Sequence, residues 1–178
     1  MASQPYRVFK NKKERGDMVT NLEPLMIEKV QKCLESHVGG EAYFTELDTA
    51  IKADEELMRT FLHRIVIETK ITNFVMSGEI GKCYASMFSP NDINLFLLPG
   101  GLRHDNEIPY NIGKVFDGMD FVFVDDTYYS GKTLNKVKEY MKTTGANLIA
   151  SYVFYDGSKH NKDGVKSIYR YYDYHNVY

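Results

Sequence analysis

The sequence predicts an α/β fold with a mostly parallel, twisted sheet flanked by helices. After Lys70, short apolar segments alternate with segments whose apolar residues recur at helical spacing. The apolar segments are continuous rather than alternating, which is typical of parallel strands covered on both faces. The chain has 178 residues, 43% hydrophobic and 26% charged, which is enough for one domain with a sizeable core. Ligands of such sheets bind beyond the carboxyl ends of the strands, so functional residues are expected there.

The N-terminal part is expected to be helical after a loose arm. Residues 1–20 are polar and basic and predict a flexible arm. Within residues 21–69, apolar side chains recur at helical spacing over residues 22–36. A second helix is expected after Asp54, whose side chain suits an N-cap.

Residues 70–158 form the expected core of a single domain that spans residues 1–178. Segments with the composition of buried strands are residues 72–76, 93–98, 121–124 and 148–155. Between them the pattern predicts a tight loop over 77–81, a short helix over 82–88 and a longer helix over 133–143. Residues 159–178 form a tyrosine-rich tail.

Charge and cysteine content exclude several classes of protein. Lys and Arg number 22 and Asp and Glu 24, for a formal net charge of −2, which argues against a protein that holds nucleic acid mainly by neutralising phosphates. Two cysteines, Cys33 and Cys83, are too few for a disulfide framework. The sequence shows no apolar run that could cross a bilayer and no secretory signal. We therefore expect a cytoplasmic protein with free thiols and neither membrane nor nucleic-acid partners.

The most informative segment is residues 121–134, FVFVDDTYYSGKTL, where an apolar strand leads into two acids and a small-residue turn that opens a helix. Backbone N–H groups of residues 129–133, at a helix N-terminus, can cradle a phosphate. The Ser130 and Thr133 hydroxyls add donors, and the glycine between them lets the backbone approach closely. Asp125 and Asp126 suit sugar hydroxyls, or a Mg²⁺ ion held through water. The segment implies a ligand with hydroxyls at one end and phosphate at the other.

This segment resembles the ribose-phosphate signature of the type I phosphoribosyltransferases, which is an apolar run, two acids, a few variable residues and then Thr/Ser-Gly-x-Thr. The resemblance covers residues 70–158. It implies Mg²⁺-dependent transfer of a 5-phosphoribosyl group from phosphoribosyl pyrophosphate to a nitrogenous acceptor, with release of pyrophosphate. It also implies that Asp125 and Asp126 hold the ribose hydroxyls. The residues implied to bind the rest of the ribose phosphate are Thr127, Tyr128, Tyr129, Ser130, Gly131, Lys132 and Thr133.

Two further segments occupy positions where this family has loops. The segment in the place of the pyrophosphate loop consists of Ser77, Gly78, Glu79, Ile80, Gly81 and Lys82. The family's basic-Gly-Gly core is replaced there, so an ordinary turn between strand and helix is an equal alternative. Residues 102–120 fill the place of a flexible loop over the reacting centre, where Arg103, His104 and Lys114 are candidates to neutralise the leaving pyrophosphate. The predicted catalytic set is Arg103, Asp125, Asp126 and Tyr129.

Acceptor recognition is assigned to Tyr155 and Asp156, at the end of the fourth predicted strand. The chain has 14 Tyr and no Trp, and its tyrosine-rich tail fits a base-binding surface, a subunit contact or a final strand. We expect a protein that acts on small-molecule substrates as a homo-oligomer, with a dimer as the first expectation.

Tyr129 stands where many members of this family carry an acid–base carboxylate. A tyrosine, with an ordinary pKa of about 10, is a poor base near neutrality. This departure keeps open a second hypothesis, a non-catalytic or regulatory module that binds phosphoribosyl pyrophosphate or a nucleotide. A third is a P-loop-like phosphotransferase, because residues 131–133 match the second half of that motif, although Asp126 occupies the place of its first glycine.

Overall fold

The structure is a computed structural model that describes residues 22–36, 41–98 and 112–174. Within these residues, five parallel strands form one sheet in the spatial order β2-β1-β3-β4-β5. Their bounds are β1 Asn73–Ser77, β2 Asn94–Leu98, β3 Asp120–Tyr128, β4 Asn147–Asp156 and β5 Lys166–Arg170. The predicted α/β class with a parallel sheet is confirmed.

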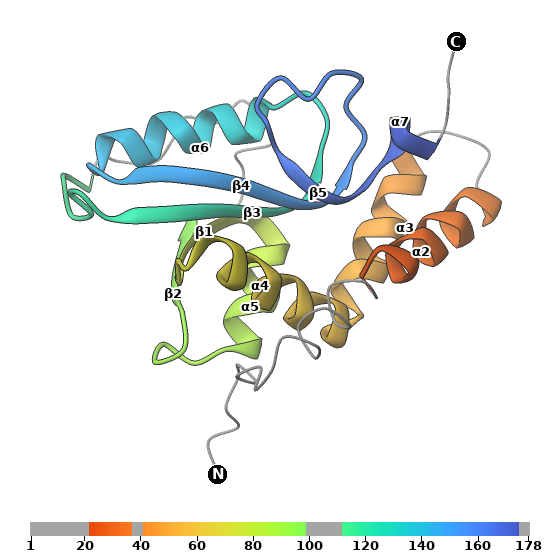
Figure 1. Cartoon of the computed structure of the whole chain (residues 1–178), viewed down its shortest axis with the longest axis horizontal. Helices are drawn as coiled ribbons and strands as arrows, with labels where there is room; N and C mark the ends of the chain where they lie inside the picture. The colour runs from red at the N-terminus through yellow and green to blue at the C-terminus, as the bar shows by residue number, and fades with distance from the viewer. Residues whose placement is uncertain (1–21, 37–40, 99–111, 175–178) are drawn as a thin grey trace.

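Helices cover both faces of the sheet (Figure 1). On one face, Leu134 and Val137 of α6 pack with Phe121 and Phe123 of β3 in a buried cluster. The other helices contribute to a second buried cluster on the opposite face. Figure 1 shows α2 and α3 beside the end of the sheet where the strand arrows point. The helices are α2 Leu22–Ser36, α3 Glu41–Lys52, α4 Glu55–Thr69, α5 Gly78–Met87, α6 Lys132–Thr143 and α7 Tyr171–Tyr174.

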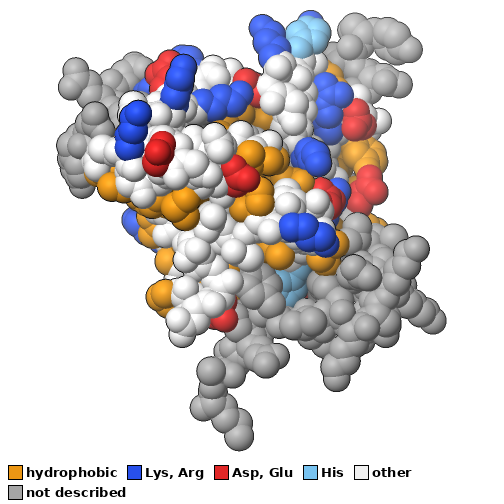
Figure 2. Space-filling view, turned by 60° about the vertical axis from the view of Figure 1, so that its left-hand side comes forward, with side chains coloured by type: hydrophobic (Ala, Val, Ile, Leu, Met, Phe, Trp, Pro, Cys, Tyr) orange, Lys and Arg blue, Asp and Glu red, His pale blue; other side chains and the backbone are white. Residues whose placement is uncertain are grey.

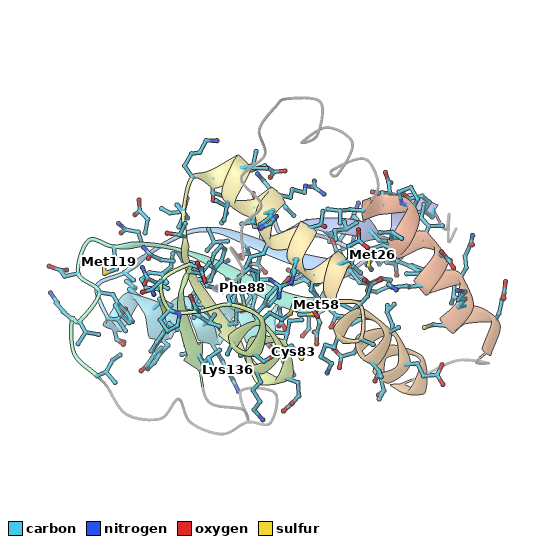
Figure 3. All side chains as sticks on the ribbon, turned by 90° about the horizontal axis from the view of Figure 1, so that it is seen from below. Met26, Met58, Cys83, Phe88, Met119 and Lys136 are labelled. Atoms are coloured by element: carbon cyan, nitrogen blue, oxygen red, sulfur yellow. The ribbon has the colours of Figure 1, made fainter. Side chains whose placement is uncertain are left out.

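Two of the three N-terminal helices agree with the sequence prediction. Helix α2 has the predicted bounds, and α4 follows the predicted N-cap, where Asp54 Oδ1 accepts a hydrogen bond from Leu57 N at 2.9 Å. Helix α3 was not predicted. Figure 3 shows Met26 of α2 and Met58 of α4 in the part of the molecule that holds these helices, and both side chains are fully buried. The three helices therefore share one core.

The segment after β1 is a helix, so the predicted tight loop over residues 77–81 is wrong. Gly78, at φ +65°, turns the chain out of the strand in one residue, and α5 begins there. The helix then packs on the sheet through Ile80, which is 1% exposed. A Cβ at Gly81 would lie 2.6 Å from Leu97 Cδ2, so this glycine allows close packing of helix and sheet.

Strand β3 is longer than the predicted strand over 121–124. Its ladder with β4 continues to the pairs Thr127–Tyr155 and Tyr128–Asp156. The acidic pair therefore lies within the strand rather than after it. A turn of three residues, 129–131, joins β3 to α6.

The tyrosine-rich tail contributes a final strand, which was one of the three alternatives for it. Strand β5 pairs with β4, and Tyr169 of β5 stacks on Tyr155 of β4 with ring centroids 5.7 Å apart. Tyr169 is 3% exposed, because the sheet continues past the predicted core boundary at residue 158.

The described surface carries charges of both signs, and the two cysteines do not form a disulfide. Lys and Arg side chains are mixed with Asp and Glu side chains on the face that Figure 2 shows. Within the described residues, neither Cys33, which is buried, nor Cys83 forms a disulfide bond. In the described part of the chain, every helix is too short or too polar to span a membrane.

Candidate functional site

A cavity of about 340 Å³ lies at the carboxyl end of β3. Residues 127–133, which the sequence analysis assigned to the ribose phosphate, all line it, together with Asp125. Helix α3 contributes to the wall through Thr45 and Asp48. The structure thus brings the acid, the small-residue turn and the start of α6 into one cavity.

The start of α6 supplies hydrogen-bond donors to this cavity. Gly131 is the N-cap residue, at φ +76°, and it has no side chain that could bond the first N–H groups of the helix. Lys132 N donates to Ser130 Oγ over a long 3.4 Å. The first N–H groups of a helix have no partner within the helix, and together with the positive end of the helix dipole they favour an anion at this position.

The acidic pair is ordered by hydrogen bonds with its own backbone. Asp125 Oδ1 accepts from Asp126 N at 2.9 Å, and Asp126 Oδ1 accepts from Thr127 N at 2.7 Å. Both carboxylates are buried, and of the two only Asp125 lines the cavity. In the described ranges, no group of three His, Cys, Asp or Glu side chains is arranged to hold a metal ion. The pair on its own is therefore not a complete metal site.

Helix α3 adds a carboxylate that the sequence analysis missed. Asp48 lines the cavity and its carboxyl group lies close to that of Asp126. Burial and the Asp126 carboxylate raise the pKa of Asp48 to about 6, while Lys52, its ion-pair partner, acts in the opposite direction. The available signal was the four-residue spacing of Leu47 and Ile51, both fully buried, which predicts a helix with one apolar face.

Residues 77–82, the predicted pyrophosphate segment, lie at the end of the neighbouring strand β1 and in the first part of α5. They are not among the residues that line the cavity. Lys82 Nζ donates to Glu79 Oε1 at 2.6 Å, and both side chains are mostly exposed. The basic side chain of this segment is therefore paired with its acidic one, and the role of the segment toward pyrophosphate stays a prediction.

Tyr155 and Asp156, the predicted acceptor-binding residues, are 2% and 0% exposed. Asp156 Oδ1 accepts hydrogen bonds from Ser158 N at 2.8 Å and Ser158 Oγ at 2.6 Å, and its Oδ2 lies 3.4 Å from Arg170 Nε. Neither residue lines the cavity. Their role toward an acceptor stays a prediction.

Tyr129 is the exposed aromatic residue of the turn, at 36%. Its ring centroid lies 6.0 Å from that of Tyr155. A Cβ at Gly157 would lie 2.1 Å from Tyr129 Cε1, so the ring rests against the backbone of this glycine. The ring position is therefore set by the end of β4.

The predicted catalytic Arg103, and His104 beside it, lie outside the described residues. Lys114, the third basic candidate of that segment, is described and exposed, and it is not one of the residues that line the cavity.

Comparison with known proteins gives one family match and several structural similarities. Residues 95–176 match the model of the phosphoribosyl transferase domain family. No curated protein matches the chain.

Among solved structures, a purine phosphoribosyltransferase from Pyrococcus horikoshii is similar at 20% identity and a TM-score of 0.46, over 60% of this chain and 75% of that one. A phosphoribosyltransferase from Corynebacterium diphtheriae is similar at 13% identity and a TM-score of 0.49, over 67% and 77%. An adenine phosphoribosyltransferase from Leishmania donovani is similar at 14% identity and a TM-score of 0.49, over 67% and 66%.

The family match includes the part of the cavity formed by β3, the turn and α6, while Thr45 and Asp48 of α3 lie outside it. Asp125, the turn over residues 129–131 and the first residues of α6 all fall inside residues 95–176. Residues 95–176 therefore match the phosphoribosyl transferase domain family, and the predicted resemblance to this family is confirmed.

Proposed function

We propose that the chain catalyses Mg²⁺-dependent transfer of a 5-phosphoribosyl group from phosphoribosyl pyrophosphate to a nitrogenous base or related acceptor. Phosphoribosyl transfer in general follows from the matched domain. One observation carries the finer proposal: a single cavity holds both Asp125 and the start of α6. The carboxylate accepts hydrogen bonds from sugar hydroxyls, and the helix start donates them to a phosphate.

The protein's part in this reaction is mainly to hold the sugar. The N–H groups at the start of α6 and the Ser130 and Thr133 hydroxyls bind the 5′-phosphate, and Asp125 orients the ribose. The bond from the anomeric carbon to pyrophosphate breaks, the pyrophosphate leaves with the electron pair, and the acceptor nitrogen forms the new bond. A proton on that nitrogen passes to solvent. Fixing both ends of the ribose lowers the barrier by positioning the anomeric carbon.

The donor set fits Mg²⁺ only with help from the substrate. Mg²⁺ prefers oxygen ligands and keeps several waters, and Asp125 and Asp126 would contact it through water. Since the described residues offer no cluster of three ligands, most of its inner ligands would be substrate and water oxygens. When bound, the ion neutralises charge on the leaving pyrophosphate.

The P-loop alternative does not agree with the geometry. That motif needs a loop from the place of Asp126 to Gly131, but Asp126 lies inside β3, between residues that pair with β4. The connection to α6 consists of residues 129–131 only. This turn leaves too little backbone to wrap around a chain of phosphates.

The alternative of a non-catalytic binding module is favoured by Tyr129. Its phenol is a poor base near neutrality, and it occupies the position where the family resemblance expects a carboxylate. A module of this kind would bind phosphoribosyl pyrophosphate in the same cavity without turnover. Pyrophosphate release with a panel of purine and pyrimidine bases separates the two hypotheses.

Calorimetry tests the binding step. We expect phosphoribosyl pyrophosphate with Mg²⁺ to bind and ATP with Mg²⁺ not to bind. Asp125→Asn combined with Asp126→Asn is expected to weaken binding at least tenfold, because Asp125 loses charge-assisted bonds to the ligand and both residues lose the negative charge that attracts Mg²⁺. Asp120→Asn, at the exposed opposite end of β3, serves as the matched control and is expected to bind as the wild type does. Unchanged binding in the double variant means that the ribose assignment is wrong.

The proposal also includes a cytoplasmic homodimer with small-molecule substrates. Light scattering on the purified full chain measures the oligomeric state, and a monomer at micromolar concentration contradicts the dimer.

A further inference from the structure

We propose that Asp163, in the connection between β4 and β5, is a positioning residue for the phosphate-binding turn and acts through Tyr128. The inference rests on the proposed function, because it takes the turn over residues 129–131 as the place of the 5′-phosphate. Asp163 lies 35 residues after Tyr128 in the chain, and no motif of the sequence points to it.

Both carboxylate oxygens of Asp163 accept hydrogen bonds. Tyr128 Oη donates a hydrogen bond to Oδ2 at 2.6 Å, and Lys138 Nζ donates one to Oδ1 at 2.7 Å. The Asp163 side chain is 19% exposed. Hydrogen bonds to an ionised acceptor are shorter and stronger than neutral ones. Asp163 thus links the last residue of β3 to the body of α6, on either side of the turn.

The charge states agree with this arrangement. The bonds from Lys138 and Tyr128 lower the pKa of Asp163, so its carboxyl group is ionised near neutrality. Burial, followed by the bond to Asp163, raises the pKa of Tyr128, so its hydroxyl keeps the proton that it donates.

The pair lies against Gly131 itself. A Cβ at Gly131 would lie 2.7 Å from Asp163 Oδ2 and 3.2 Å from Tyr128 Oη. Gly131 is the N-cap of α6 and lines the cavity. The hydrogen-bonded pair therefore lies against the backbone of the turn, whose residues line the cavity.

The connection that carries Asp163 is itself held in place. Gly157 N, at its start, donates to Tyr128 O at 2.9 Å. Asn161 bonds Val165 twice, donating to its carbonyl at 2.6 Å and accepting from its N–H at 2.8 Å. Val165 is buried in the same cluster as Tyr128. Asp163 is thus fixed by neighbours on both sides and can determine where Tyr128 lies.

A carboxylate this close to a phosphate site needs its charge offset. The Tyr128 hydroxyl and the Lys138 ammonium group supply that compensation. Without the Tyr128 hydroxyl, Asp163 Oδ2 loses its hydrogen-bond donor on the side that faces the turn. The turn then loses its support, and the remaining negative charge opposes a bound phosphate.

Binding of phosphoribosyl pyrophosphate with Mg²⁺, and of ribose 5-phosphate alone, measured by calorimetry on the full chain, tests the inference. Tyr128→Phe and Asp163→Ala are each expected to raise both dissociation constants about tenfold, which corresponds to about 1.4 kcal/mol. The double variant is also expected to raise the dissociation constants by no more than about tenfold over the wild type, because the two residues act as one unit. Tyr128→Phe decides alone if Asp163→Ala does not fold.

Tyr152→Phe is the matched control for a loss of stability. It removes a similar bond, from Tyr152 Oη to Glu68 Oε2 at 2.8 Å, outside the cavity. If the wild type binds neither ligand, the proposed function is wrong, and the positioning role of Asp163 is then wrong as well. If the wild type binds and Tyr128→Phe binds as tightly as Tyr152→Phe, the inference is overturned while the proposed function stands. A double variant that is about a hundredfold weaker also overturns it, because the two residues then act separately.

Discussion

Gly131 is subject to two constraints that can be separated by experiment. Its φ of +76° is unfavourable for a residue with a Cβ, and a Cβ there would also meet Asp163 Oδ2 at 2.7 Å. Gly164 has the first constraint without the second, because its φ is +63° and no atom lies within 4 Å of a Cβ. The two glycines therefore form a matched pair.

Gly131→Ala is expected to weaken binding of phosphoribosyl pyrophosphate more than tenfold and to lower the free energy of unfolding by about 2 kcal/mol. Gly164→Ala is expected to cost about 1 kcal/mol of stability, from backbone strain alone, and to leave binding unchanged. Calorimetry and urea unfolding measure the two effects. Equal dissociation constants for the two variants would mean that the turn tolerates displacement and that its backbone does not bind the phosphate.

Substitutions at Tyr129 test whether this residue takes part in proton transfer. Because its phenol is a poor base, Tyr129→Phe is expected to leave kcat within about twofold of the wild type, the ring still resting against Gly157. Tyr129→Asp introduces a carboxylate and is expected to raise kcat for acceptors that must lose a proton, by about tenfold or more, with a new acidic limb near pH 4. A large loss of kcat in Tyr129→Phe would instead assign a chemical role to the hydroxyl.

Among the helices, α4 offers the sharpest test at the scale of one element. Asp54 caps its first turn through Leu57 N and forms an ion pair with Lys29 of α2 at 2.7 Å. Burial acts to raise the pKa of Asp54, but the bonds from Lys29 and from Leu57 N outweigh it and lower that pKa below its ordinary value of 3.8. The charged carboxylate therefore stabilises the fold. This contribution is present above the unfolded-state pKa and is lost as the pH falls through the lower folded-state pKa.

Asp54→Ala is expected to lower the free energy of unfolding at pH 7 by about 1 kcal/mol or more, since it removes both the cap and the ion pair. Asp54→Asn keeps an oxygen that can accept the capping hydrogen bond, so it is expected to lower the free energy of unfolding less than Asp54→Ala does. Urea unfolding between pH 7 and pH 2.5 measures both. The wild type is expected to approach Asp54→Asn at the acidic end, and a constant difference over this range contradicts the lowered pKa.

Element prediction from the sequence succeeded where local signals agreed with packing. Helix α4 has a cap residue and an apolar stripe in register, and β4 is a continuous apolar run. The error at residues 77–81 has a different origin, because the prediction places Gly78 in a loop, whereas this glycine makes the whole turn by itself. The prediction ends β3 too early because Asp, the residue type at positions 125 and 126, is rarely found in strands. In the structure, hydrogen-bonded pairing with β4 overrides that preference.

At the scale of the whole molecule, the motif predicted which residues line the cavity, but not what surrounds them. Residues 127–133 are contiguous, so their proximity follows from the chain itself. Asp48 and Asp163 reach the same region from a helix near the N-terminus and from a connection near the C-terminus. Local spacing can indicate the helix that carries Asp48, but it does not indicate that either residue reaches this region, since their positions follow from the packing of the complete fold. Contacts of this kind require the three-dimensional structure.

The N-terminal helices and the sheet share a core, so we expect them to unfold together. Phe61 of α4 is 1% exposed, and its ring centroid lies 4.3 Å from that of Phe154 in β4. Phe61→Ala is expected to lower the free energy of unfolding by about 3–5 kcal/mol, from lost burial and the cavity that remains. Ile149→Ala, at a side chain that is 52% exposed, is the control and is expected to cost less than about 1 kcal/mol.

Two probes distinguish one cooperative unit from two. The chain has no Trp, and ten of its 14 Tyr lie at or after residue 128, so tyrosine fluorescence reports mainly on the part of the chain from the end of β3 onward. Circular dichroism at 222 nm is dominated by the helices. Coincident urea transitions, shifted together by Phe61→Ala, indicate a single cooperative unit. If the substitution shifts only the dichroism transition, α4 unfolds separately from the sheet. In that case the N-terminal helices, including α3 with Asp48, could unfold while the phosphate-binding turn stays folded.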